Sequence, residues 1–348
     1  MDFGYYMDVV SLFTGAGGMD IGFEDAGFRV VVAVESDPIA AKTYRMNNPH
    51  VKMLEGDVRE AIPDLANYRG VTLMIGGPPC QGYSLAGGMD LEDPRSNLIF
   101  SFCDALEMVQ PNVFVMENVD NLAKHEKFEE IRTRLYERFN KAGYQFKVHI
   151  VDAKRYGVAQ KRKRMFIVGS KTKVPISGHH LLGFEQPLIS VRKVIGHLGR
   201  PGSLNNLYPA NAKIVPVKLP QLRRTPFAGM LFNGQGRVID LDGLAGTLPA
   251  SMGGNRTPII DQRWLDDKTR EPWVQSYYDR IKAGVAPSDI CVPDFMRRLT
   301  VTEAALIQTF PKDYVFAGTV PQMFSQVGNA VPCKMASAVA CAIKEYML

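Results

Sequence analysis

The stretch that decides the fold reads Gly76-Gly77-Pro78-Pro79-Cys80-Gln81-Gly82-Tyr83-Ser84. It follows Val71 to Ile75, a short apolar run typical of a buried strand. Two glycines allow unusual backbone angles, and two prolines fix φ and remove amide donors, so neither the strand nor a helix continues here. The pattern predicts a stiff loop at the carboxyl end of a strand, where open α/β sheets carry ligands and catalytic groups. We interpret Cys80 as a nucleophile in that loop; the alternative is a small buried cysteine in a rigid turn.

A glycine-rich turn follows the first expected strand, over residues 7–13, and precedes a helix expected over 20–26. Its sequence is Thr14-Gly15-Ala16-Gly17-Gly18. Glycine lets the backbone approach a ligand closely, and a helix N-terminus offers free amides, so the turn predicts a nucleotide-type cofactor site. The dinucleotide fingerprint fails because Asp20 stands three positions after Gly17, which disfavours NAD and FAD.

Three acidic residues follow expected strands. Glu35 ends the second strand, where a carboxylate can hold a ribose diol, although a solvated glutamate is the alternative. Asp57 follows the next strand-like segment and is either an acceptor for an adenine amino group or a turn residue. Glu117 ends the apolar run 113–116, where partial burial would raise its pKa and suit a proton donor; the alternative is a structural helix cap.

A basic run over residues 155–164 leads into an expected strand over 165–169. Arg162 and Arg164 share one side of an extended chain, and two guanidiniums on one face can hold a phosphate or a base carbonyl. A basic run is more often a solvated face, so this prediction depends on the neighbouring strand.

The composition of the chain changes between residues 171 and 294, where Pro, Gly and Asn are frequent and the helical periodicity of apolar residues becomes weaker. We predict a first domain over 1–172, a second, smaller domain over 173–295, and a closing segment over 296–348 in which helical order returns. Glycine-flanked arginines such as Arg237 can reach base edges or phosphates, although each alone reads as an ordinary surface residue. Thr300 and Glu303 predict a capping box, and Pro332 is expected to open the last helix.

Composition restricts the kinds of partner, site and compartment that fit this sequence. The 348 residues carry a formal net charge of +5, which permits a nucleic-acid partner without demonstrating one. Five cysteines without CxxC pairing indicate neither a disulfide framework nor a zinc site, so we expect a reducing compartment and no metal. We see no secretory signal and no apolar run long enough to cross a bilayer.

With these pieces in order, nearly the whole chain resembles DNA cytosine-5 methyltransferases of the bacterial restriction–modification type. Tyr83 and Thr14 are small departures, standing where phenylalanine and alanine or serine are commoner. The motifs that carry the resemblance are Phe13-Thr14-Gly15-Ala16-Gly17-Gly18, Glu35, Gly77 to Ser84, Glu117-Asn118-Val119, Gln160-Lys161-Arg162-Lys163-Arg164, Arg298-Leu299-Thr300 with Glu303, and Gln326 to Pro332.

The resemblance implies a fold and a set of partners. The fold is a Rossmann-like methyltransferase core, a mixed and mostly parallel sheet with helices on both faces, plus a smaller, irregular, mainly-β target-recognition domain. Residues 1–172 then form the cofactor-binding and catalytic domain, 173–295 the DNA-binding target-recognition domain, and 296–348 return to complete the catalytic domain. The methyl donor is S-adenosyl-L-methionine, and the substrate is double-stranded DNA with its target base flipped out. We expect a monomer in the bacterial cytoplasm that protects host DNA from a cognate restriction endonuclease, a genetic partner.

The resemblance also implies roles for individual residues. Cys80 attacks carbon 6 of cytosine, Glu117 bonds to ring nitrogen 3 and the amino group, and Arg162 and Arg164 contact the base carbonyl and orient the cysteine loop. Eight residues are implied to contact the cofactor. Phe13 stacks on the adenine, Asp57 binds the adenine amino group, and Glu35 binds the ribose. The amino-acid end lies beside Gly15, Gly17 and Gly18, the remaining contacts come from Pro79 and Asn329, and Asn329 also braces the catalytic loop. On the DNA side stand Gln81, Ser84, Arg237 and Thr247.

Three alternatives remain open. An RNA cytosine-5 methyltransferase shares the core, but the Cys-Phe-Thr tripeptide of the tRNA-methylating branch is absent from this sequence. A catalytically silent DNA-binding homologue is disfavoured because Cys80, Glu117 and both arginines occur together. A dinucleotide oxidoreductase is disfavoured by the failed fingerprint. The target sequence and the oligomeric state are not readable from the chain.

Overall fold

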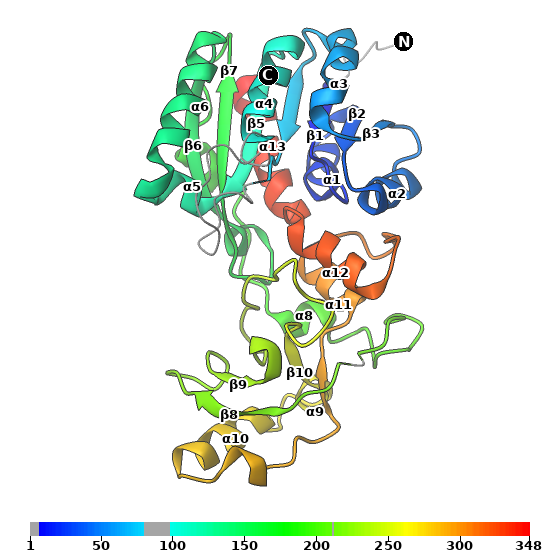
Figure 1. Cartoon of the computed structure of the whole chain (residues 1–348), viewed down its shortest axis with the longest axis vertical. Helices are drawn as coiled ribbons and strands as arrows, with labels where there is room; N and C mark the ends of the chain where they lie inside the picture. The colour runs from blue at the N-terminus through cyan, green and yellow to red at the C-terminus, as the bar shows by residue number, and fades with distance from the viewer. Residues whose placement is uncertain (1–6, 80–97, 211) are drawn as a thin grey trace. The chain divides into compact units, whose positions relative to one another are not determined.

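The structure is a computed structural model in which residues 7–79, 98–210 and 212–348 are described. The chain divides into two compact units, whose elements are labelled in Figure 1. The first unit comprises Met1–Tyr156, Lys163–Gln186 and Val331–Leu348, and the second comprises Gly157–Arg162 and Pro187–Ala330.

Seven strands form one sheet in the first unit, in the order β3-β2-β1-β4-β5-β7-β6. The strands are β1 (Asp8–Leu12), β2 (Arg29–Glu35), β3 (Lys52–Glu55), β4 (Leu73–Gly76), β5 (Val113–Val119), β6 (Gln145–Asp152) and β7 (Lys163–Ser170). The pairs β3-β2, β2-β1, β1-β4 and β4-β5 are parallel, whereas β7 runs antiparallel to both β5 and β6. Because parallel strands end at the same edge, the segments after β1, β2, β4 and β5 meet there.

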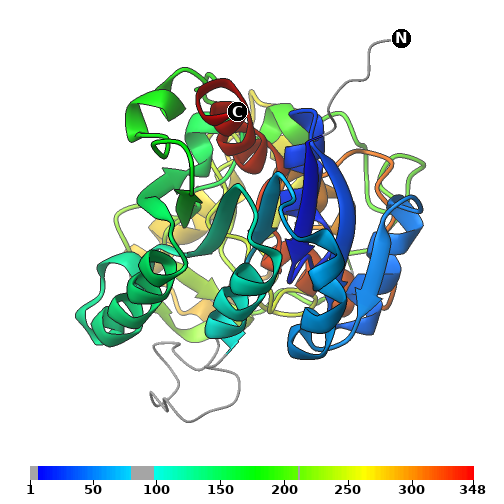
Figure 2. The ribbon, with the colours of Figure 1, turned by 90° about the horizontal axis from the view of Figure 1, so that it is seen from above.

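Helices cover both faces of this sheet. The helices of the first unit are α1 (Gly18–Asp25), α2 (Pro38–Asn47), α3 (Val58–Leu65), α4 (Leu98–Val109), α5 (Asp120–Lys124), α6 (Glu129–Lys141), α7 (Gly178–Leu182) and α13 (Cys333–Met347). Helices α3, α4 and α6 lie on one face (Figure 2), where alternate strand residues such as Val10, Met74 and Phe114 form a core with Phe102 of α4 and Leu135 of α6. The strands are buried on both sides, which explains why β4 is apolar at successive positions.

Helix α13 packs closely on α1, which joins the end of the chain to its beginning within the first unit. A Cβ atom on Gly22 of α1 would lie 2.4 Å from the carbonyl oxygen of Cys333 and 2.6 Å from the Cβ of Ala336. Only glycine permits this approach, so Gly22 sets the separation of the two helices.

The second unit contains two small antiparallel sheets joined by short helices and loops. Strand β8 (Pro216–Gln221) pairs with β9 (Met230–Phe232), and β10 (Ile259–Asp261) pairs with β11 (Met296–Arg298). Its helices are α8 (Val191–Ile195), α9 (Gln262–Asp266), α10 (Trp273–Lys282), α11 (Val301–Ile307) and α12 (Val320–Asn329). Leu231, Phe232, Val274 and Tyr277 belong to its buried core.

The predicted fold class is confirmed, namely a mostly parallel sheet covered by helices with small extra antiparallel sheets. The capping box is also confirmed, because Thr300 Oγ1 accepts from the Glu303 amide at 3.1 Å and Glu303 Oε2 accepts from the Thr300 amide at 2.9 Å. Pro332, predicted as the first residue of the last helix, is the N-cap of α13, so the helix begins one position later, at Cys333.

The compact units do not follow the predicted domain limits throughout. Residues 296–330 lie in the second unit, and the return to the first unit begins at Val331. The reason is local pairing, since β11 is held by β10 and α11 packs against α12. The functional labels of the domains stay predictions. In the described part of the chain, no helix combines the length and the apolar character that a membrane crossing requires.

Candidate active site

The candidate site is built at the edge of the sheet where β1, β2, β4 and β5 end. These strands deliver the Phe13 turn, Glu35, the Gly77-Pro78-Pro79 segment and Glu117. Parallel strands with α/β connections place such segments in one crevice. Three predicted site residues, Cys80, Gln81 and Ser84, lie outside the described residues.

The glycine-rich turn after β1 has an unusual backbone. Phe13, Gly15 and Gly17 have φ values of 54°, 56° and 79°, all in the left-handed region. Glycine adopts that region freely, whereas Phe13 does so only where its surroundings impose it. A Cβ on Gly15 would find nothing within 4 Å, so open space lies beside the turn. Gly17 is the N-cap of α1, and Gly18 begins that helix.

Glu35 binds this turn directly. Its Oε2 accepts from the Gly15 amide at 2.7 Å, and its Oε1 accepts from the Asp37 amide at 2.7 Å. Burial raises the pKa of Glu35, and the two amides oppose that rise. Each carboxylate oxygen keeps a second lone pair for a further donor. The residue therefore suits the predicted ribose contact.

Asp57 occupies the N-cap of α3. Its Oδ1 accepts from the Arg59 amide at 2.9 Å, and the Arg59 guanidinium bonds to the same carboxylate. The hydrogen bond from the Arg59 side chain is the main cause that lowers the pKa of Asp57. The predicted contact with an adenine amino group would have to share this carboxylate with Arg59.

Glu117 and Arg164 form an ion pair of 3.1 Å between Oε1 and Nε. Glu117 is buried, with 9% of its surface exposed. Its Oε2 would lie 3.0 Å from a Cβ on Gly77, so the carboxylate rests against the backbone of the segment that precedes Cys80. The antiparallel pairing of β5 with β7 sets this contact, since Val119 lies opposite Arg164.

Asn118 is a site residue to which the sequence reasoning gave no role. Its Nδ2 donates to the carbonyl oxygen of Pro78 at 3.0 Å, and its Oδ1 accepts from the Val119 amide at 2.9 Å. Its position inside the Glu117-Asn118-Val119 motif was the available signal. Asn118 therefore ties the end of β5 to the loop after β4.

The described hydrogen bonds of Arg162 differ from the ion pair of Arg164. Strand β7 begins at Lys163, so the alternation that would align the two arginines does not extend to Arg162. Arg162 belongs to the second unit, is buried, and donates to the carbonyl oxygens of Leu248, Gly328 and Ala330 at 3.0–3.2 Å. In this structure its guanidinium binds backbone of its own unit, and the predicted contact with the base carbonyl stays a prediction.

The other predicted residues of the second unit lie in loops or at helix ends. Asn329 ends α12 and is exposed, and Arg237 is exposed after Gly236. Thr247 Oγ1 donates to the carbonyl oxygen of Lys161 at 2.7 Å, which fixes Thr247 to the Gln160–Arg164 motif.

Arg298 supports the loop that carries Arg237. Its Nη2 donates to Asn233 Oδ1 at 2.7 Å, its Nη1 donates to the Thr257 carbonyl at 2.8 Å, and a Cβ on Gly236 would clash with Nη1. Burial lowers the pKa of Arg298 to about 10. In the sequence, Arg298 is part of the Arg298-Leu299-Thr300 motif, and no local pattern predicts this contact.

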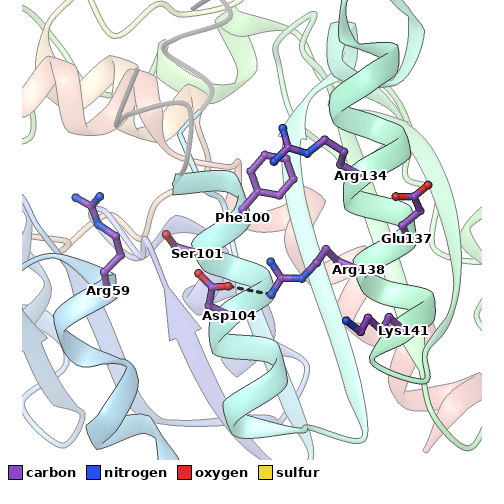
Figure 3. Close-up of a pocket in the computed structure, with 8 residues that line it drawn as sticks. All are labelled: Arg59, Phe100, Ser101, Asp104, Arg134, Glu137, Arg138 and Lys141. Atoms are coloured by element: carbon purple, nitrogen blue, oxygen red, sulfur yellow. Dashed lines mark hydrogen bonds and ion pairs between the residues drawn. The ribbon is translucent and has the colours of Figure 1, made fainter. Parts of the chain in front are cut away.

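A separate hollow of about 540 Å³ lies between α3, α4 and α6 (Figure 3). Arg138 Nη2 pairs with Asp104 at 2.8 Å, and the Arg134 guanidinium lies 4.7 Å from the centre of the Phe100 ring. Arg59 is bound to Asp57, so all three arginines of the hollow have partners, and none of its described lining residues is a predicted site residue.

The sheet, in which the antiparallel strand β7 lies between β5 and β6, has the Rossmann-like fold of solved DNA methyltransferase structures. The solved structure of the Dnmt2 methyltransferase from S. pombe has a similar fold, with a TM-score of 0.68 and 16% identity over 98% of this chain and 100% of that one.

The family model described as C-5 cytosine-specific DNA methylase matches residues 7–345. The Type II methyltransferase M1.HphI of Haemophilus parahaemolyticus is 32% identical over 96% of this chain and 86% of its own length. The Type II methyltransferase M.MthTI of Methanothermobacter thermautotrophicus is 32% identical over 97% of both chains. The chain belongs to the C-5 cytosine-specific DNA methylase family and is a DNA (cytosine-5-)-methyltransferase.

Proposed function

We propose that this protein is the modification enzyme of a type II restriction–modification system. It methylates carbon 5 of one cytosine in a specific double-stranded DNA sequence, with S-adenosyl-L-methionine as donor and Cys80 as nucleophile. The full-length similarity to type II methyltransferases supports the biological role. One observation supports the chemistry most directly: the Glu117 carboxylate is paired with Arg164 and rests against Gly77, three positions before Cys80.

Covalent attack makes carbon 5 reactive. The Cys80 thiolate forms a bond to carbon 6 while Glu117 supplies a proton to ring nitrogen 3, which leaves carbon 5 as the nucleophilic end of an enamine. S-adenosylmethionine supplies a methyl group on a sulfonium, and S-adenosylhomocysteine is released. Loss of the carbon 5 proton to a base then returns the electrons that expel the Cys80 sulfur. A guanidinium beside the sulfur, for which we propose Arg164, would favour the thiolate, since a free thiol has a pKa of about 8.5.

The residues at the sheet edge fit such a donor. Glu35 can accept ribose hydroxyls with its remaining lone pairs, and the open side of Gly15 leaves room beside the turn. Phe13 offers an aromatic face for the adenine. Pro79 and Asn329 complete the proposed cofactor contacts.

The target carbon is inaccessible inside a duplex, so the cytosine must be flipped out at a cost of a few kcal/mol. Gln81 and Ser84 would stabilise the opened duplex, and Arg237 and Thr247 would contact DNA. Phosphate contacts from the basic second unit would offset the cost and make binding salt-dependent.

The deciding experiment incubates purified protein with plasmid DNA and S-adenosylmethionine and then locates the modified base by conversion sequencing. We expect 5-methylcytosine at one position of a short recurring sequence, and none with Cys80→Ser. A parallel reaction on tRNA tests the main alternative. Methylation of tRNA but not of DNA would reject the proposal.

A further inference from the structure

A buried carboxylate lies behind the glycine-rich turn. Asp20, in the first turn of α1, has only 1% of its surface exposed. Its Oδ1 accepts from Ser11 Oγ at 2.7 Å, and its Oδ2 accepts from Thr14 Oγ1 at 2.7 Å and from the Tyr44 hydroxyl at 2.8 Å. The sequence reasoning used Asp20 only to exclude a dinucleotide fingerprint.

The three hydroxyls come from different parts of the first unit. Ser11 lies in β1, Thr14 lies in the turn, and Tyr44 lies in α2 and is fully buried. Asp20 itself belongs to α1, so one carboxylate joins a strand, a turn and two helices. Charge-assisted hydrogen bonds of this kind are stronger than neutral ones and hold their donors in a narrow geometry.

Thr14 is the member of this cluster that lies inside the candidate cofactor site. It stands between Phe13 and Gly15, whose φ values of 54° and 56° are both left-handed. A phenylalanine keeps that conformation only where neighbouring contacts impose it. The Thr14 side chain is bound by Asp20, and the Thr14 amide donates to the Val34 carbonyl at 3.2 Å, immediately before Glu35.

We propose that Asp20 is a positioning residue of the S-adenosylmethionine site, which rests on the function proposed above. By binding the Thr14 hydroxyl, it holds the turn in the shape that presents the Phe13 ring to an adenine and the Gly15 amide to Glu35. Ser11 and Tyr44 hold the carboxylate in place through their hydroxyls. Asp20 is not in contact with the reacting atoms.

Near-isosteric variants of the full chain test this inference. Thr14→Val and Tyr44→Phe each remove one hydroxyl, and Asp20→Asn keeps the shape but replaces an acceptor by a donor. The matched control is Asp25→Asn, at the exposed end of the same helix. The readouts are the dissociation constant for S-adenosylhomocysteine by calorimetry, the KM values for S-adenosylmethionine and for DNA, and the thermal unfolding midpoint.

We expect Asp20→Asn and Thr14→Val to weaken S-adenosylhomocysteine binding about tenfold, the loss typical of a hydrogen bond to a charged group. Tyr44→Phe, which leaves the hydrogen bond between Thr14 and Asp20 in place, should weaken it by a smaller factor, and Asp25→Asn should leave it unchanged. The KM for S-adenosylmethionine should rise while the KM for DNA stays constant. If Asp20→Asn does not fold, the two hydroxyl variants, which keep the carboxylate, decide the test.

A merely structural role predicts a different pattern. Variants that lower the unfolding midpoint but bind S-adenosylhomocysteine as the wild type does would overturn the inference and leave the proposed function intact. A wild-type protein that binds neither S-adenosylmethionine nor S-adenosylhomocysteine would overturn both.

Discussion

The Asn118 side chain donates a hydrogen bond of 3.0 Å to the carbonyl oxygen of Pro78. The two residues are 40 positions apart in the sequence and lie at the ends of neighbouring parallel strands. Glu117, the adjacent residue, rests against Gly77. Consecutive side chains of β5 therefore contact the segment that leads to Cys80.

Asn118→Ala removes the donor to Pro78 and should lower kcat by about a hundredfold, because a small displacement of a catalytic group has a cost of that order. Affinity for S-adenosylhomocysteine should stay within twofold of the wild type. Single-turnover methylation of a DNA oligonucleotide measures the effect. The control is Asn121→Ala, whose side chain is exposed in α5; equal losses in both variants would contradict this role.

Cys80→Ser should abolish methyl transfer while cofactor and DNA binding persist, because a serine hydroxyl is a far weaker nucleophile than a thiolate. Wild-type protein should form an adduct with 5-fluorocytosine DNA that survives denaturation, since fluorine at carbon 5 cannot leave as a proton does. Gel electrophoresis under denaturing conditions detects the adduct, and Cys291→Ser, at an exposed cysteine, is the control. An active wild type that never traps would contradict the covalent route.

Arg164 and Arg162 should respond differently to substitution. Arg164→Ala removes the side chain that orients the Glu117 carboxylate and should lower kcat about a hundredfold, the cost of a small displacement of a catalytic group, with a small change in stability. Arg162→Ala leaves the carbonyls of Leu248, Gly328 and Ala330 without this donor. It should therefore lower the free energy of unfolding by about 3 kcal/mol.

Thermal or urea unfolding of both variants, alongside methylation rates, checks this contrast. An Arg162→Ala protein of full stability with a selectively lowered kcat would instead favour the direct contact with the base carbonyl that the resemblance implies.

His149 should make stability depend on pH. Burial lowers its pKa from the ordinary value of 6.5, with Lys147 and His180 also disfavouring the charge, while a hydrogen bond with the Ile176 backbone opposes the shift. The unfolded chain therefore binds a proton at a higher pH than the folded one. The contribution of neutral His149 to the free energy of unfolding is fully present above pH 6.5. It is lost as the pH falls toward the pKa of the folded protein, by at most about 1.4 kcal/mol per pH unit.

Urea unfolding between pH 8 and pH 5 measures this dependence. In His149→Asn, whose amide does not titrate, the slope below pH 6.5 should be reduced, whereas His179→Asn, at an exposed position, should keep it. An unchanged slope in His149→Asn would assign the pH dependence to other groups.

Local patterns in the sequence were sufficient to predict the main strands and the residues that follow them. The apolar run before Gly76, the run before Glu117 and the glycine turn after residue 13 each predict a strand that leads into a candidate site residue. Strands β4 and β1 end at these points, whereas β5 continues through Glu117 to Val119. The Thr300–Glu303 capping box is equally local, since both partners lie within one helical turn. Such features depend on residues a few positions apart, which is the range over which periodicity and turn chemistry act.

Contacts between distant residues were decided by the tertiary structure. Arg164 reaches Glu117 because β7 runs antiparallel to β5 with Val119 opposite Arg164, a register that the basic run itself does not encode. Arg162 lies just before the first residue of that strand and binds carbonyls some 86 to 168 positions away.

The Asp20 cluster has the same origin. Asp20 binds Ser11, Thr14 and Tyr44 because a strand, a turn and two helices pack around one buried carboxylate. The sequence determined which residue types stand at the edge of the sheet; only packing decided which of them bind one another, because a buried polar group must find its partner wherever the fold brings one within hydrogen-bond distance.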